Sequence, residues 1–290
     1  TFLQEGIIQE NTPVFPCSHG FNYGSLHVGC HGHASPLPLI PAIATSCNSY
    51  FCWGLFRMLG DRKYGSPQNA LTVWKDHMVS QGFGYRLDVD LPGEGRGFIP
   101  NAGVYDKAYR GRWNGLTIIS ISIGQGEILA TPLQIANLGA TIANRGHFTP
   151  PHIVKEIQDG ELDSIYRTPR VPTIERQYYE EIVKGMRAAV TGGTCRIAGS
   201  ILPGVEVCGK TGTAQNRGKD HSAFMGFAPM NNPKIAIAVY VENGGFGATY
   251  GVPIGALMMD QYLHGKLSPE NEKLAEDFSN RIIYYGDEER

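Results

Sequence analysis

The octapeptide GKTGTAQN at residues 209–216 combines a cation, two hydroxyl groups and bare backbone in consecutive positions. It follows hydrophobic VEVC and precedes a polar turn, so we expect it on a strand, with Lys210 and Gly212 on one face and Thr211 and Thr213 on the other. A glycine inside a strand usually marks a close approach of another backbone. A cation and hydroxyls there would suit an added peptide strand that ends in a carboxylate. The plain alternative is an ordinary strand that carries Lys-Thr-Gly by chance.

A second polar pair, Ser46 and Asn48, flanks Cys47 in the phrase ATSCNSYF. Ser and Asn are mediocre helix residues, useful mainly where their side chains hydrogen-bond a specific partner. Capping or turn chemistry would explain the pair taken alone. Ser-x-Asn followed by Lys-Thr-Gly, however, matches the order of the second and third signature elements of penicillin-binding proteins and class A β-lactamases. The two motifs together therefore favour acyl-transfer chemistry.

A loop rich in Cys and His, PCSHGFNYGSLHVGCHGH, holds a third set of reactive side chains: Cys17, His19, His27, Cys30, His31 and His33. The Cys30-x-x-His33 spacing is typical of metal sites. A zinc site of Cys17, Cys30 and His33 would need one more thiolate or imidazole ligand. A disulfide between Cys17 and Cys30 is the first alternative, and side chains with no shared bond are the second. Zinc is favoured because a disulfide would leave the histidines unexplained.

The elements that must position these residues mix helices and strands. Apolar spacing and caps predict helices at 41–59, 67–81, 131–146, 173–190 and 251–265. Alternating or continuous apolar runs predict three strands at 204–215, 222–230 and 234–245. We therefore expect an α+β fold with an antiparallel sheet flanked by helices. Cys52, Cys195 and Cys208 lie on predicted helix or strand faces and are expected to be small core residues.

Composition excludes several classes of function. The 290 residues are 42% hydrophobic and 18% charged, which is typical of a globular chain. The net charge of −2 provides no basic field for nucleic acid. The longest apolar run, IAIAVYV at 235–241, is far shorter than the roughly 20 residues that a membrane-spanning helix needs.

These motifs together resemble the transpeptidase domain of class B penicillin-binding proteins, specifically the elongation type called penicillin-binding protein 2. The resemblance covers nearly all of residues 1–290, taken as one transpeptidase domain that contains the Cys/His loop at 11–40. Its carriers are AIATSCNSYF, DVDLPGEGRGFIP, SIGQGEILATPLQIANLGATIANRG, GKTGTAQN and AFMGFAPMNNPKIAIAVYVENGG. The IGQG and TPLQ phrases discriminate most, because β-lactamases lack them. The resemblance implies a penicillin-binding protein/β-lactamase-like fold.

One departure from the family pattern concerns the nucleophile. The acylated serine of this family belongs to Ser-x-x-Lys, and no serine in the sequence has Lys three positions later. Thr72-Val73-Trp74-Lys75 is the nearest imitation, but Lys75 falls on the solvated face of a predicted helix. We therefore expect the chain to lack the N-terminal part of its domain, including the nucleophile and a membrane anchor, and to be inactive alone.

The resemblance implies roles for the residues that remain. A serine outside the chain would attack a D-Ala-D-Ala stem peptide, and the acyl-enzyme would be resolved by an amine of a second stem. Ser46 would relay a proton, Lys210 would keep that network cationic, and Asn48 would hydrogen-bond the missing lysine and the substrate amide. Catalysis needs no cofactor.

Three residues of the Lys-Thr-Gly strand would bind the substrate. The Thr211 and Thr213 hydroxyls would engage the substrate carboxylate, and the Thr213 N–H would supply half of the oxyanion hole. Gly212 would let the peptide backbone approach. The implied partners are stem peptides, β-lactams and a membrane glycan polymerase of the elongation machinery. The implied location is the periplasmic face of the bacterial inner membrane.

The resemblance also suggests the fourth zinc ligand. Some elongation-type relatives have a metal site that ties this loop to the helix of the Ser-x-Asn motif, which makes Cys47 the expected partner of Cys17, Cys30 and His33. Two other functions stay open for the whole chain. One is a penicillin-recognising sensor that binds without turnover. The other is a β-lactamase-like hydrolase, which would need a carboxylate-bearing loop that we do not find between the two motifs.

Overall fold

The computed structural model describes residues 1–12 and 15–284, which form two compact units. The first unit comprises Thr1–Leu39 and Cys47–Glu180, and the second comprises Ile40–Ser46 and the chain from Glu181 onward. The boundary between the units therefore passes through the Ser-x-Asn motif. Ser46 belongs to the second unit, whereas Cys47 and Asn48 belong to the first.

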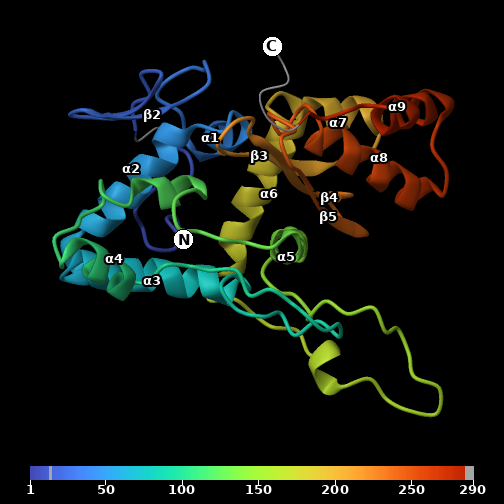
Figure 1. Ribbon diagram of the computed structural model, residues 1–290, viewed down its shortest axis with the longest axis horizontal. Coiled ribbons are helices and arrows are strands. Elements are labelled where there is room, and N and C mark those ends of the chain that lie inside the picture. Colours follow the sequence, from blue (N-terminus) through green and yellow to red (C-terminus); the bar gives the residue numbers. More distant parts are fainter. Residues whose placement is uncertain (13–14, 285–290) are drawn as a thin grey trace. The chain divides into compact units, whose positions relative to one another are not determined.

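The second unit is built on a three-stranded antiparallel sheet of β3 (Cys208–Ala214), β4 (His221–Ala228) and β5 (Ile235–Val241), in the order β3-β4-β5 (Figure 1). The three predicted strands are confirmed, as is the α+β class. In the part of the chain that the structure describes, β3 pairs with β4 alone, in a register that sets Thr211 opposite Phe224. The Lys-Thr-Gly strand thus lies at a sheet edge.

Helices cover this sheet and close its core. α8 (Gly251–His264) packs against β4 and β5, and both α7 (Arg196–Ile201) and α9 (Pro269–Ser279) pack on α8. Phe224 is 1% exposed at the centre of this packing. The helix comes so near that a Cβ at Gly255 would lie 2.5 Å from the Phe224 ring. Glycine there permits the close contact that seals the core.

The first unit is mainly helical. Its elements are β1 (Gly20–Tyr23), β2 (Leu26–Gly29), α2 (Asn48–Gly60), η1 (Arg62–Tyr64), α3 (Pro67–Ser80), α4 (Ala102–Tyr109), η2 (Ile119–Ile123), α5 (Pro132–Ala143) and η3 (Ser164–Tyr166). The hairpin β1–β2 packs on α2, with the Phe21 and Trp53 ring centroids 4.8 Å apart. α6 (Arg176–Thr191) begins in this unit and continues into the second. Within residues 1–12 and 15–284, no helix is long and apolar enough to cross a membrane.

Capping residues set two of the predicted helices. The Ser66 side chain accepts a hydrogen bond from Asn69 N–H at the start of α3, with Pro67 inside the first turn. Thr131 and Gln134 form a reciprocal capping box at the start of α5. Each arrangement satisfies backbone donors that the first helical turn leaves open. Both helices were predictable from these local signals.

The predicted helix over 41–59 is wrong as a single element. The structure divides it into α1 (Leu39–Ala44) and α2, separated by a turn in which Ser46 has a φ of 57°. The side chain of Cys47 caps α2 by accepting from Tyr50 N–H. The short polar run Thr-Ser-Cys competes with helical hydrogen bonding, and a left-handed serine costs about 1–2 kcal/mol. Such strain persists only where the surroundings impose it.

The start of the predicted helix over 173–190 also differs. α6 begins at Arg176, three residues later than expected. Thr173 does not cap it, because its Oγ1 lies 2.7 Å from His77 Nδ1 and 3.0 Å from Ser80 Oγ, both on or near α3. A tertiary contact has replaced the local cap that the sequence pattern favoured.

Candidate active site and metal centre

Lys210 and Ser46 meet in the second unit through a direct hydrogen bond. The Lys210 ammonium donates to Ser46 Oγ at 2.7 Å and to the Thr211 carbonyl oxygen at 3.0 Å. Lys210 reaches this position from β3, and Ser46 reaches it from the turn after α1, 164 residues away in sequence. The structure thus joins the two predicted motifs at the two side chains assigned to proton transfer.

The surroundings of Lys210 disfavour its charged form. Burial is the main cause that lowers the Lys210 pKa to about 8, and the Cys195 thiol opposes this shift. An ammonium with such a pKa can donate a proton or hydrogen bond near neutral pH and can also exchange its proton there. The Lys210 and Ser46 pair is therefore suited to passing protons.

Thr211 and Thr213 are held by partners outside the strand. The Thr211 hydroxyl donates to Thr194 Oγ1 at 2.8 Å. Thr213 Oγ1 accepts from Gly247 N–H at 3.4 Å. A Cβ at Gly247 would lie 2.6 Å from the Gly212 carbonyl oxygen, so the segment before α8 passes very near the strand. The backbone that approaches Gly212 in the structure is therefore the chain's own backbone at Gly247.

Thr194 is a contact that sequence reasoning missed. It follows α6 in the phrase TGGTC, which carries no spacing typical of catalysis. Only the fold brings it to Thr211. Cys195, beside it, is fully buried, as are Cys52 and Cys208, so the prediction that these three are core residues is confirmed.

Gly193 presses the same segment against the end of α1. A Cβ at Gly193 would lie 2.1 Å from the Ala44 carbonyl oxygen, whereas a Cβ at Gly192 would meet nothing within 4 Å. We therefore expect Gly193→Ala to lower the free energy of unfolding by about 1–3 kcal/mol through overpacking against backbone. Denaturant titration measures this, with Gly192→Ala as the matched control. Equal stability of the two variants would contradict the expected steric clash.

Asn48 opens α2 in the first unit. Its Nδ2 donates to the Gly29 carbonyl oxygen at 2.9 Å, at the end of β2 and next to Cys30. The amide is thereby tied to the Cys/His loop. Its predicted contacts with a lysine and a substrate amide remain predictions.

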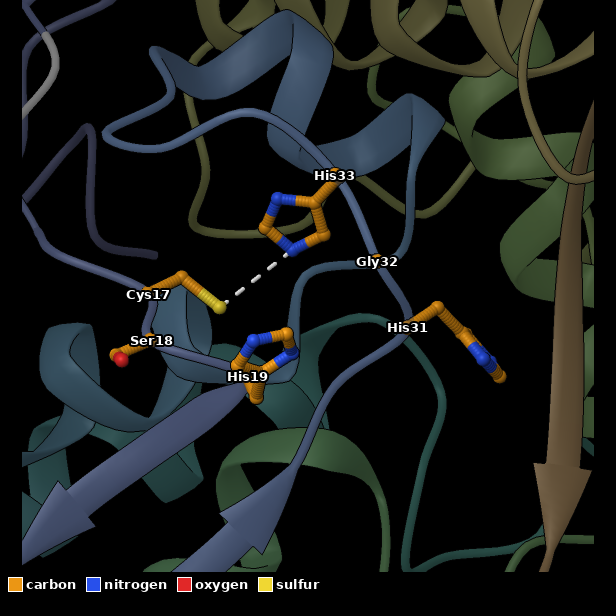
Figure 2. Close-up of a pocket in the computed structure, with 6 residues that line it drawn as sticks. All are labelled: Cys17, Ser18, His19, His31, Gly32 and His33. Carbon is orange, nitrogen blue, oxygen red and sulfur yellow. Dashed lines mark hydrogen bonds between the residues drawn. The ribbon is translucent and has the colours of Figure 1, made fainter.

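Cys17, Cys30, His33 and Cys47 converge within the first unit. Their sulfur and nitrogen ligand atoms all lie within 4.8 Å of one another. Figure 2 shows the His33 ring aimed at the Cys17 thiol, with 3.6 Å between Nε2 and Sγ, while His31 points away. Cys30 Sγ and Cys47 Sγ are 4.0 Å apart. Ligands at about 2.3 Å from a tetrahedral zinc would be separated by about 3.8 Å, so the spacing and the donor set fit zinc.

Hydrogen bonds around the cluster prepare its atoms for a cation. His33 Nδ1 lies 2.7 Å from the Ala34 carbonyl oxygen, which places the ring proton on Nδ1 and leaves the Nε2 lone pair toward the sulfurs. Cys30 Sγ accepts from Ser49 N–H at 3.3 Å, and Cys47 Sγ accepts from Tyr50 N–H at 3.4 Å. These donors come from the first turn of α2, whose dipole favours negative charge.

The thiols influence one another strongly. The hydrogen bond with Cys47 is the largest cause that lowers the Cys30 pKa to about 4, and the same bond raises the Cys47 pKa. Burial, followed by the contact with Cys30, raises the Cys17 pKa. Without a metal ion, the negative charge of the three thiols is therefore concentrated on Cys30.

Comparison with known proteins identifies the family. The family model described as "Penicillin binding protein transpeptidase domain" matches residues 1–260. The chain belongs to this transpeptidase family. Its fold, with an antiparallel sheet and covering helices, is the fold of penicillin-binding protein structures.

Several members of the transpeptidase family are similar in sequence. Peptidoglycan D,D-transpeptidase MrdA of Acinetobacter baumannii is 34% identical over 228 residues, which is 72% of this chain and 32% of the relative. MrdA of Escherichia coli K12 is 28% identical, over 94% of this chain and 44% of the relative. The chain therefore spans less than half the length of these curated relatives.

Solved structures of penicillin-binding protein 2 are similar as well. The protein from Pseudomonas aeruginosa, in complex with WCK 5153, matches with a TM-score of 0.76 and 30% identity over 93% of this chain and 58% of that one. The protein from Helicobacter pylori, in complex with MreC, matches with a TM-score of 0.72 and 25% identity over 91% and 47%.

Proposed function

We propose that this chain forms part of the domain of a peptidoglycan D,D-transpeptidase, which cross-links stem peptides ending in D-Ala-D-Ala through a serine acyl-enzyme that β-lactams also form. The observation that carries the proposal is the 2.7 Å hydrogen bond that Lys210 donates to Ser46. Lys210 belongs to the Lys-Thr-Gly edge strand β3, and Ser46 belongs to the Ser-x-Asn motif. The names of the MrdA relatives support it.

Each remaining residue takes the role that the resemblance implies. Ser46 relays the proton between the nucleophile and the leaving amine, and Lys210 supplies the positive charge beside it. Asn48 hydrogen-bonds the substrate amide. The Thr211 and Thr213 hydroxyls bind the substrate carboxylate, the Thr213 N–H contributes to the oxyanion hole, and Gly212 leaves room for the substrate backbone. The open edge of β3 receives the peptide as an added strand.

We assign the acylated serine to another part of the full-length protein. No serine of the sequence is followed by Lys three positions later, and the chain spans 32–44% of the MrdA relatives described above. That other part of the full-length protein would carry a membrane anchor and the contacts with a glycan polymerase at the periplasmic face of the inner membrane. A solved relative comes from a peptidoglycan synthase complex that coordinates polymerisation and crosslinking, which supports this partner.

Labelled penicillin tests the proposal on the full-length protein. We expect a covalent adduct at one serine that persists for many minutes, because a transpeptidase site does not activate water for deacylation. Formation of the adduct without cross-linking of stem peptides would favour a penicillin sensor. Rapid release of the label would favour a β-lactamase-like hydrolase. Absence of any adduct would refute penicillin recognition itself.

We also propose that Cys17, Cys30, His33 and Cys47 hold a structural zinc ion. The convergence of three sulfurs and one imidazole nitrogen within 4.8 Å supports this set over a Cys17–Cys30 disulfide. When bound, zinc would hold all three thiols as thiolates and cross-link the loop to the start of α2. Because Cys47 is the middle residue of the Ser-x-Asn motif, a zinc ion bound to the four ligands would fix the backbone of this motif at Cys47.

A further inference from the structure

Thr194 bridges the two segments that carry the reacting pair. Its backbone N–H donates to the Ala44 carbonyl oxygen at 3.1 Å, two residues before Ser46. Its Oγ1 accepts from the Thr211 hydroxyl at 2.8 Å, one residue after Lys210. One residue thus contacts both the turn and the strand whose side chains meet in the Lys210 and Ser46 hydrogen bond.

The Thr194 side chain is half-buried and lies between Thr211 and the buried Cys195. The neighbouring Cys195 thiol is fully buried, and this burial raises its pKa to about 11, although contacts with Lys210, Thr194 and Thr211 oppose the shift. A hydroxyl has one proton and two lone pairs, so Thr194 can accept from Thr211 or donate to it. A thiol that stays protonated near neutral pH leaves Thr194 free to change between these roles.

We propose that Thr194 is a positioning residue for carboxylate recognition: it fixes the Thr211 hydroxyl and, by becoming its donor, turns the Thr211 proton toward the substrate. A carboxylate only accepts hydrogen bonds, so the Thr211 proton must leave Thr194 when the carboxylate binds. The Thr194 hydroxyl then donates to Thr211 Oγ1, so the two hydroxyls keep a hydrogen bond of the opposite direction. The inference rests on the proposed function, since it presumes that Thr211 binds a carboxylate.

The geometry distinguishes possible replacements at position 194. Thr194 is β-branched and anchored through its backbone, so its Oγ1 atom can occupy few positions, although the hydroxyl proton can still rotate. Valine would place a methyl group where Oγ1 lies 2.8 Å from Thr211 Oγ1, which is closer than a carbon and an oxygen approach one another. Thr211 would have to turn away. Serine keeps a hydroxyl and should preserve the exchange.

Acylation kinetics of the full-length protein with benzylpenicillin and with its methyl ester test this inference. The ester lacks the anionic carboxylate. We expect Thr194→Val to slow acylation by benzylpenicillin roughly two- to tenfold, as for loss of one hydrogen bond, and to slow acylation by the ester much less. Thr194→Ser should restore most of the rate. Thr191→Val is the matched control, because the Thr191 hydroxyl bonds only to Ala188 within α6 among the hydrogen bonds described.

A double-mutant cycle separates a positioning role from a general structural one. In the Thr211→Val background, Thr194→Val should cause no further loss if it acts through Thr211. Equal losses with both probes, additive losses in the cycle, or no loss at all would overturn the inference while leaving the proposed function intact. Failure of the wild-type protein to react with either probe would overturn both. Melting curves of Thr194→Ser and Thr194→Val identify any variant that fails to fold, and Thr194→Ala, which removes the hydroxyl without adding bulk, then replaces the valine variant in both comparisons.

Discussion

Replacing Lys210 by methionine should slow acylation of the full-length protein by benzylpenicillin about 10²–10⁴-fold, which is the usual range for removing a proton-transfer group. The change keeps most of the apolar stem and deletes the ammonium that donates to Ser46 at 2.7 Å. Stopped-flow or gel-based acylation kinetics measure the effect. Lys266→Met, at an exposed position of the same unit, is the matched control and should react like the wild type.

The pH dependence of acylation shows whether the cationic or the neutral form of Lys210 supports the reaction. Burial lowers the Lys210 pKa to about 8, so the side chain is cationic below that pH and neutral above it. If the cation supports Ser46, the acylation rate should fall as the pH rises through about 8. Lys210→Arg retains its charge throughout this range and should lose the fall, at some cost in absolute rate. A wild-type rate that climbs steadily past pH 8 would show that neutral Lys210 is the working form.

Replacing Cys47 by alanine should abolish stoichiometric zinc binding and lower the melting temperature of the full-length protein. Three remaining ligands hold zinc far less tightly than four, and metal binding to the folded state adds directly to stability. With free zinc at a thousand times its dissociation constant, that contribution is about 4 kcal/mol. Elemental analysis and thermal unfolding, with and without a chelator, measure the two effects.

Cys52→Ala is the matched control for the metal prediction. Cys52 is a fully buried cysteine on the same helix, α2, and contacts Ser122 Oγ at 3.3 Å instead of the cluster. It should retain zinc. Unchanged metal content in Cys47→Ala would remove Cys47 from the ligand set. A wild-type protein without metal, with Cys17 and Cys30 joined by a disulfide in its mass spectrum, would replace the zinc proposal by its alternative.

The sequence predicted those elements whose signals are local. Thr131 with Gln134, and Ser66 with Asn69, mark helix starts because capping depends on residues three positions apart. The three strands after residue 204 were readable because apolar runs there alternate with polar turns. Lys210 could be placed on a strand for the same reason, whereas its position at the sheet edge comes from the structure.

The turn at Ser46 could not be predicted from the same rules. Apolar periodicity continues on both sides of Thr45-Ser46-Cys47, which favours an unbroken helix. The break depends on contacts that are distant in sequence, namely Lys210 with Ser46 and the packing of Gly193 against Ala44. Thr194 escaped notice for a similar reason, because its partner Thr211 is 17 residues away and on another element.

The left-handed backbone of Ser46, with its φ of 57°, also affects the thermodynamics of activation. Its conformation is already restricted in the folded protein, so the serine loses little further freedom when a substrate arrives. The activation entropy of acylation should therefore contain only a small unfavourable contribution from this turn. A glycine at position 46 would adopt the same φ without strain, but it would regain that freedom and would also lose the hydroxyl that Lys210 contacts.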